Sequence, residues 1–428
     1  MRFDPRSSLA GHIRVSLVAA ALLAAACSPD VPDPSSDSTW VGTITTEGVV
    51  TTVVNASGSL WGGTSSLVEE LSIGVEAGDE PYLFGAVAGV GIAGDRMYVL
   101  DAQVLKVRVY GGTGVHVMDF GGEGDGPGEF RRPTGLAVGL DRVNVRDPQT
   151  GRISVFSHEG ELLETWPTRP LFTSIPIVAT IAGVGELLVP DRGAMVPWGP
   201  EGPAGPGVEF PAFDSRPLMV TVRITEAIPG YSAGTVIGGP VPFWPSPAFA
   251  MSPTGAIIYG EADRYAFVIE QRDGSMIQVE SSLEPVPIGA EEANWHRSRL
   301  VDRIRQVDPA WRWDGPEVPT TKPAYNQFVP ALSGEVWVVR MGPGYEDFDC
   351  DPTSAMDEAP ERCWKDSRIV DVFDADGRFS GAVDIPGELR FVPRPFIRDE
   401  TVVGVVQDET GTIMVKRYRL VLPGEGKR

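Results

Sequence analysis

The sequence predicts an all-β protein assembled from repeated four-stranded antiparallel sheets. Residues 89–115 align with residues 135–161 at an offset of 46 residues, so one structural unit occurs at least twice. Within each copy, short runs of alternating apolar and polar residues are separated by turn residues, as in antiparallel strands. A period in the forties made of such strands is the sequence signature of a β-propeller blade.

The strands of the two clear copies can be placed from this alternation. We expect strands at 89–93, 97–101, 106–110, 115–120, 143–147, 152–156 and 161–166. Gly114 and Gly160 follow the third strand of each copy, where a tight hairpin needs positive φ.

The two clear copies share an acid at the end of the second strand, an aliphatic residue eight positions on and a glycine thirteen positions on, and this pattern recurs a third time. Asp101, Asp147 and Glu261 are the acids of this pattern. Further strand pairs are expected at 186–191 with 218–224, at 335–341 with 369–377, and at 401–408 with 413–420. The count is six blades of four strands between residues 40 and 425.

One helix is expected, over residues 290–307. Glu291 and Glu292 stand in its first turn and Arg303 and Arg305 in its last, which suits the helix dipole. Its arginines either hold an anionic ligand, with the helix as a lid over one mouth of the ring, or pair with this protein's own carboxylates.

Closing a ring of blades requires strands from both ends of the chain. Segments 41–54 and 67–74 are rich in β-branched or alternating residues, so region 40–74 is expected to supply ring-closing strands. We predict that one or both join the C-terminal blade as its outer strands.

The N-terminus carries a targeting signal. Three arginines precede an apolar run over 15–26, and Ala24-Ala25-Ala26-Cys27 follows Leu23. This resembles the bacterial lipobox, which implies a lipoprotein signal peptide over 1–26, lipidation of Cys27 and a location in the bacterial cell envelope, facing the periplasm or the exterior. The alternative is an ordinary secreted protein. Residues 27–39, rich in Ser, Pro and Asp, suit a flexible tether.

The net charge of −22 argues against nucleic acid as a partner. The expected partners are the membrane, through the lipid anchor only, and an unidentified protein, peptide or carbohydrate ligand.

The segment GGEGDGPGEFRRPTGLAV at 121–138, followed by RISVF at 152–156, resembles the NHL-repeat class of six-bladed propellers and the bacterial six-bladed β-propeller lipoproteins. The resemblance implies the fold. It does not select a function, because such propellers act as binding platforms, as lyases and as calcium-dependent lactone hydrolases. The glycine run itself is expected to be a connector between blades, since its acids would repel phosphate.

Cys350 and Cys363 have twelve residues between them. In an oxidising compartment this pair is expected to form a disulfide, with free thiols or a metal pair as the alternative.

The insertion at 345–364, which contains both cysteines, has carboxylates at the spacing of an EF-hand-like calcium loop. They are Asp347, Asp349, Asp351 and Glu358. Pro352 stands where such a loop needs glycine, so an acidic surface loop pinned by the disulfide explains the same residues.

Other candidates are weaker. Asp101, Asp147 and Glu261 recur at one blade position, which favours a structural role in accepting backbone N–H bonds. His116 and His158 are expected at the rim, which disfavours a histidine-based metal centre on the axis. Trp198, Trp244, Trp295, Trp311 and Trp313 either line a ligand groove or fill gaps between blades.

The sequence therefore predicts a lipid-anchored binding or scaffold module whose ligand sits at one mouth of the ring. It identifies no catalytic residue and no cofactor. The alternative is a calcium-dependent hydrolase or lactonase, which would need carboxylates and an asparagine converging on the axis.

Overall fold

The computed structural model describes residues 39–169, 177–179, 186–191, 194–209, 211–213, 218–347 and 363–425. In these ranges the regular secondary structure is nearly all strand, with one α-helix, α1 (Ala290–Arg305), and one 3-10 helix, η1 (Glu80–Tyr82). The predicted all-β class and the inserted helix are confirmed. The predicted signal peptide and nearly all of the predicted tether lie outside the described residues.

The strands form four-stranded antiparallel units whose members pair in chain order. The two clear sequence copies are β4 (Val87–Ala93), β5 (Arg96–Asp101), β6 (Lys106–Tyr110) and β7 (His116–Gly121), and β8 (Gly135–Val138), β9 (Val143–Asp147), β10 (Arg152–Phe156) and β11 (Leu162–Pro167). The next two are β12 (Val178–Ala179), β13 (Leu187–Asp191), β14 (Ala194–Gly199) and β15 (Gly202–Pro203), and β19 (Ala248–Met251), β20 (Ile257–Gly260), β21 (Ala266–Glu270) and β22 (Met276–Ser281). A short strand, β16 (Val208–Glu209), also pairs with β14.

The remaining units share one continuous eight-stranded sheet. They are β23 (Gln327–Pro330), β24 (Val336–Asp347), β25 (Cys363–Phe373) and β26 (Phe379–Asp384), and β27 (Phe396–Arg398), β28 (Thr401–Gln407), β29 (Ile413–Val421) and β3 (Ser65–Ile73). The two halves meet where β26 pairs in parallel with β3.

The apolar core lies between successive units and not within any one of them. Side chains of β4–β7 and β8–β11 pack together around Phe130, and β8–β11 packs in turn on β12–β15. Further clusters join β12–β15 to β19–β22, β19–β22 to β23–β26, and β23–β26 to the last unit. The last unit then packs on β4–β7 through Ile73, Val403 and Val415. Because each unit buries its faces only against its neighbours, the fold is a β-propeller and the units are its blades.

The glycines in the tight hairpins confirm the repeats that the sequence predicted. Gly114, Gly160, Gly274 and Gly377 each follow the third strand of a blade, with φ of 81°, 80°, 82° and 82°. Only glycine adopts this conformation without a steric penalty from a Cβ atom. The same turn is therefore encoded in blades whose other residues differ.

The N-terminal strands divide between two blades. β3 is the outer strand of the C-terminal blade. It pairs antiparallel with β29, from Ile73 opposite Val415 to Ser66 opposite Val421. β1 (Val41–Glu47) and β2 (Val50–Ser57) form a hairpin that joins a different blade, where β2 pairs in parallel with β22. Asn55 fixes this position, because its side-chain amide donates to the carbonyls of Glu280 and Gly377 and its Oδ1 accepts from the backbone of Phe379.

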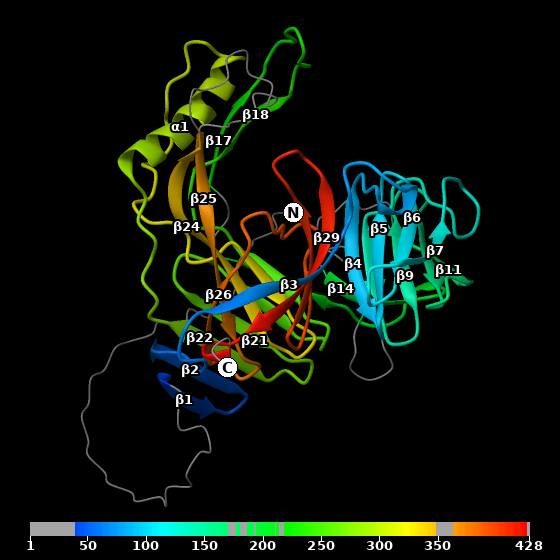
Figure 1. The fold of residues 1–428 in the computed structure, drawn as a ribbon. Helices are drawn as coiled ribbons and strands as arrows, with labels where there is room; N and C mark the ends of the chain where they lie inside the picture. The colour runs from blue at the N-terminus through cyan, green and yellow to red at the C-terminus, as the bar shows by residue number, and fades with distance from the viewer. Residues whose placement is uncertain are drawn as a thin grey trace, which may run out of the picture. The chain divides into compact units, whose positions relative to one another are not determined.

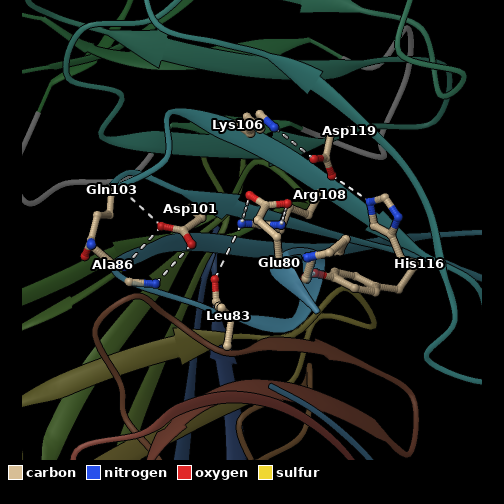
Figure 2. Close-up of polar contacts among 12 residues, drawn as sticks. Glu80, Leu83, Ala86, Asp101, Gln103, Lys106, Arg108, His116 and Asp119 are labelled. Carbon is tan, nitrogen blue, oxygen red and sulfur yellow. Dashed lines mark hydrogen bonds and ion pairs between the residues drawn. The ribbon is translucent and has the colours of Figure 1, made fainter. Parts of the chain in front are cut away.

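The segment between β3 and β4 is held against the first blade, β4–β7, by side-chain contacts. Arg108 on β6 is fully buried and its guanidinium donates two hydrogen bonds to the carboxylate of Glu80, at 3.0 and 3.1 Å (Figure 2). The hydroxyl of Tyr110 donates to the carbonyl of Pro81, and the hydroxyl of Tyr82 accepts from the backbone of His116. A bidentate charged pair of this kind holds η1 in one orientation.

One strand assignment from the sequence is wrong. Segment 218–224 was expected to complete a blade with 186–191, but β17 (Met219–Arg223) pairs only with β18 (Val236–Pro240) within the described chain. This hairpin lies beside α1 (Figure 1), and Leu300 and Ile304 of the helix pack on Val220 and Val241. The alternation of residues in 218–224 is the same whether the strand faces a blade or a helix, so periodicity could not distinguish the two.

Candidate functional site: the axial channel

The innermost strands of the blades surround a channel along the propeller axis. β4 contacts β8, β8 contacts β12, β19 contacts β23, and β27 contacts β4. Val178 of β12 packs near Met251 of β19, and the Leu332 N–H after β23 donates to the carbonyl of Ile397 on β27. A cavity of about 150 Å³ lies inside this ring and is lined by residues at or beside every innermost strand.

Small residues let the innermost strands approach closely. A Cβ atom on Gly89 would lie 2.7 Å from the Cβ of Leu136, and one on Gly91 would lie 2.6 Å from a methyl of Val138. Larger residues at these positions would push β4 away from β8 and open the ring. These two glycines therefore allow the close approach of β4 to β8 at the channel wall.

The lining is almost entirely apolar. It consists of glycine, alanine, proline, methionine, phenylalanine and branched aliphatic residues, and Thr134 and Arg394 are the polar side chains among the described lining residues. Those lining residues include no carboxylate, histidine or asparagine. The donors that the hydrolase alternative would need on the axis are thus not among them.

Arg394 is the unusual member of this lining. It is partly buried, and among the described residues it has no hydrogen bond and no ion pair. Burial lowers the pKa of Arg394 to about 10, and no neighbouring charge opposes the effect. An arginine with this pKa is still cationic at neutral pH, so the channel contains an unneutralised positive charge.

The backbone is held before Arg394 by two hydrogen bonds and after it by the pairing of β27 with β28, where Phe396 lies opposite Val403. Gln327 donates from its side chain to the carbonyl of Phe391, at 3.2 Å, and the N–H of Arg390 donates to the carbonyl of Val405, at 2.8 Å. Pro393 and Pro395 flank the arginine, and proline restricts both its own φ and the conformation of the residue before it. Arg394 therefore projects from a segment with little backbone freedom.

Sequence reasoning did not identify Arg394. The signal available was the tripeptide Pro393-Arg394-Pro395, a few residues before the strand expected at 401–408. That tripeptide indicates a stiff segment but cannot show that the arginine faces the axis or that it lacks a partner.

Two of the recurring acids, Asp101 and Asp147, have a structural role, because each accepts several backbone hydrogen bonds. Asp101 accepts the backbone N–H groups of Gly85, Ala86 and Gln103 (Figure 2). Asp147 accepts those of Arg131, Arg132, Gln149 and Thr150. Each acid thus joins its own hairpin to the chain entering the blade. Beside Glu261, the hydroxyl of Tyr325 accepts the N–H of Ala262 and holds that turn.

The histidines do not converge. His116 on β7 contacts Asp119, with 2.7 Å between Nε2 and Oδ1, and His158 lies 3.2 Å from the carbonyl of Gly139. His296 on α1 packs edge-on against Phe243, and burial lowers its pKa. In the described ranges, no three histidine, cysteine or acidic side chains are grouped as a metal site.

The predicted calcium loop and disulfide remain predictions. Asp347 ends β24 opposite Cys363 and is ion-paired with Lys365. Asp349, Cys350, Asp351 and Glu358 lie outside the described residues.

The helix and the tryptophans serve packing. Trp244, Trp311 and Trp313 contact the apolar face of α1, and Trp198 packs between two blades with its indole N–H on the carbonyl of Pro167. No residue of α1 lines the described channel. Arg305 donates to the carbonyl of Trp311, and Arg297 to the side chain of Asn294, so the expected pairing with carboxylates is not what holds these two arginines.

A buried charged cluster, which the sequence did not indicate, holds the helix to β25. The ammonium of Lys322 lies 2.7 Å from the carboxylate of Glu292 on α1, contacts Asp366 on β25, and donates to the carbonyl of Gly342 at 2.8 Å. Lys322 and Glu292 are both almost fully buried. Removing one partner would leave a buried charge uncompensated, so this cluster fixes the position of the helix.

The helices in the described part of the chain are too short or too polar to cross a membrane.

No family model and no curated protein sequence matches the chain. Among solved structures, it is similar to a member of the DUF4221 family from Bacteroides vulgatus, with 10% identity, a TM-score of 0.45, and coverage of 84% of this chain and 99% of that one. It is also similar to virginiamycin B lyase from Staphylococcus aureus, with 11% identity, a TM-score of 0.34, and coverage of 84% and 95%. At these TM-scores, the likenesses place the chain in no family and transfer no activity to it.

Proposed function

We propose that this protein is a binding module of the bacterial cell envelope, that its blades number six, and that it takes a ligand in the axial channel. The observation that carries the proposal is the channel itself. A concave, mostly apolar cavity with a few polar groups is the usual form of a small-molecule site. Here that cavity has one cation whose charge no described residue neutralises.

The location of the protein is part of the proposal and depends on the first residues of the sequence. Cleavage before Cys27 and acylation of that cysteine would attach the propeller to a membrane by lipid chains. Labelling of cells with an alkyne-tagged palmitate tests this directly. The wild-type protein should take up the label and the Cys27→Ala variant should not. Equal labelling of the two proteins would refute the anchor.

The binding function is tested by filling the channel. Leu332 is half-buried in the lining, so Leu332→Trp places a larger side chain in the cavity. Leu140→Trp makes the same change on a side chain that is 63% exposed, and it is the matched control.

A screen of small neutral, anionic and cationic fragments by ligand-observed NMR should find compounds that bind wild type and Leu140→Trp. These compounds should lose binding to Leu332→Trp. If no fragment distinguishes the two variants, the channel is not a ligand site.

A further inference from the structure

Three features of the channel together restrict what can occupy it. The described lining offers one cation and one hydroxyl, and every other side chain in it is apolar or glycine. The cation has no partner among the described residues, although the protein as a whole has a net charge of −22. The backbone that presents the cation is held by hydrogen bonds before it and by the β27–β28 pairing after it, and it is flanked by prolines.

The size of the cavity sets the size of the occupant. An apolar protein cavity of about 150 Å³ is large enough for benzene, and the axial cavity has the same volume, about 150 Å³. A hydrocarbon part of about six carbon atoms would therefore fill the cavity.

We propose that the axial channel binds a small apolar monocarboxylic acid, with its carboxylate on the guanidinium of Arg394 and its hydrocarbon part in the cavity. This inference rests on the proposed binding function and adds the chemical class of the ligand to it.

A carboxylate suits the site better than other anions. The planar guanidinium presents two parallel N–H groups to the two oxygens of a carboxylate. A phosphate or sulfate group has more oxygens and more charge to satisfy, and the described lining offers Thr134 as its one further side-chain donor. The apolar walls would also exclude the waters that such a group would retain.

A series of three ligands of one shape tests the charge requirement. 4-Fluorobenzoate, 4-fluorobenzamide and 4-fluorobenzylamine are nearly isosteric and differ at pH 7 in being anionic, neutral and cationic. Their dissociation constants for the full-length protein are measured by ¹⁹F NMR. We expect the benzoate to bind at least tenfold more tightly than the amide, and the amine not to bind.

The variants assign the effect to one residue. Arg394→Gln should weaken benzoate binding at least tenfold while changing amide binding by less than threefold, and Arg394→Lys should retain part of the preference. Arg297→Gln removes a partly buried cation of α1 that does not line the channel, and it should change neither. The fold of Arg394→Gln is not at risk, because the substitution removes a charge that has no partner.

The outcomes separate the two proposals. If benzoate and amide bind equally and Leu332→Trp abolishes both, the channel is a ligand site but the carboxylate inference is wrong. The inference is also wrong if Arg394→Gln binds benzoate as wild type does. If none of the three compounds binds and the wider fragment screen also fails, the proposed function falls together with the inference.

Discussion

At the scale of single residues, burial without a partner distinguishes Arg394 from the other buried cations. Arg108 lies against Glu80, Arg340 against Asp371, and Lys322 between two acids. Those pairs offset the cost of removing a charge from water, whereas Arg394 has no such compensation. Residues that lower the stability of the fold are expected mainly at functional sites, so an uncompensated charge at the channel wall indicates such a site.

The cost of Arg394 can be measured. Because Arg394→Met keeps much of the side-chain volume and removes the charge, the free energy of unfolding should rise by about 1–3 kcal/mol. Urea denaturation followed by tryptophan fluorescence gives this value. A decrease of similar size would mean that Arg394 has a stabilising partner within the fold.

Asp147 is the opposite case, because its buried carboxylate is compensated by backbone hydrogen bonds. Asp147→Ala leaves four backbone N–H groups without their acceptor, and we expect a loss of about 3 kcal/mol in the free energy of unfolding. Asp141→Ala is the control, because the ion pair of Asp141 with Arg142 is exposed and should contribute less than about 1 kcal/mol. Equal losses for the two variants in urea would contradict the structural role of the recurring acids.

At the scale of elements, prediction from sequence succeeded where a strand repeats and failed where it does not. The strands at 106–110, 143–147 and 152–156 have the predicted boundaries, because alternation and a turn glycine mark both ends. β12, β15 and β16 have two residues each, too few to show any alternation. The partners of β17 and of the β1–β2 hairpin depend on tertiary packing, which a strand pattern does not encode.

The α1 element is expected to open independently of β4–β11, because the Lys322 cluster ties the helix to β25 and not to those blades. The apolar cluster of the helix involves β17, β18 and nearby tryptophans and is separate from the clusters between blades. Ile304 is fully buried there, so Ile304→Ala should destabilise the helix by about 2–4 kcal/mol.

Hydrogen exchange measured by mass spectrometry should show faster exchange in 290–305, 219–223 and 236–240 in Ile304→Ala. Exchange in β4–β11 should be unchanged. Faster exchange throughout the blades would show that the helix is part of the same cooperative unit.

At the scale of the whole molecule, the ring exists because β3 completes the last blade. Without β3, the edge of β29 is unpaired and the contact of Ile73 with the first blade is lost. The β1–β2 hairpin instead adds to the outside of a blade that already has four strands, although Asn55 anchors it firmly.

Two truncations distinguish these roles. A protein lacking residues 1–58 should still unfold in one cooperative transition, with a lower Tm. A protein lacking residues 1–74 also loses β3 and should have no cooperative transition, because the propeller is then open. Thermal unfolding followed by circular dichroism makes the comparison, and identical transitions for the two proteins would show that β3 is dispensable.

The lining of the axial channel could not be predicted from the sequence. The blade pattern predicts that a channel exists, but its lining combines residues from strands at 87–93 and 396–398, which are remote in sequence. The apolar walls follow from ordinary strand composition. The position of one arginine among them is a property of the closed ring, and no local pattern could have shown it.

The pairing of β3 with β29 also has a consequence for biosynthesis. Val415 leaves the ribosome long after its partner Ile73, so β3 must remain without its neighbour while every intervening blade is made and folds. During that interval a nascent chain exposes a strand edge, which is the feature that chaperones bind and that promotes aggregation when none is present. The slowest step in maturation should therefore be the meeting of the two ends of the chain.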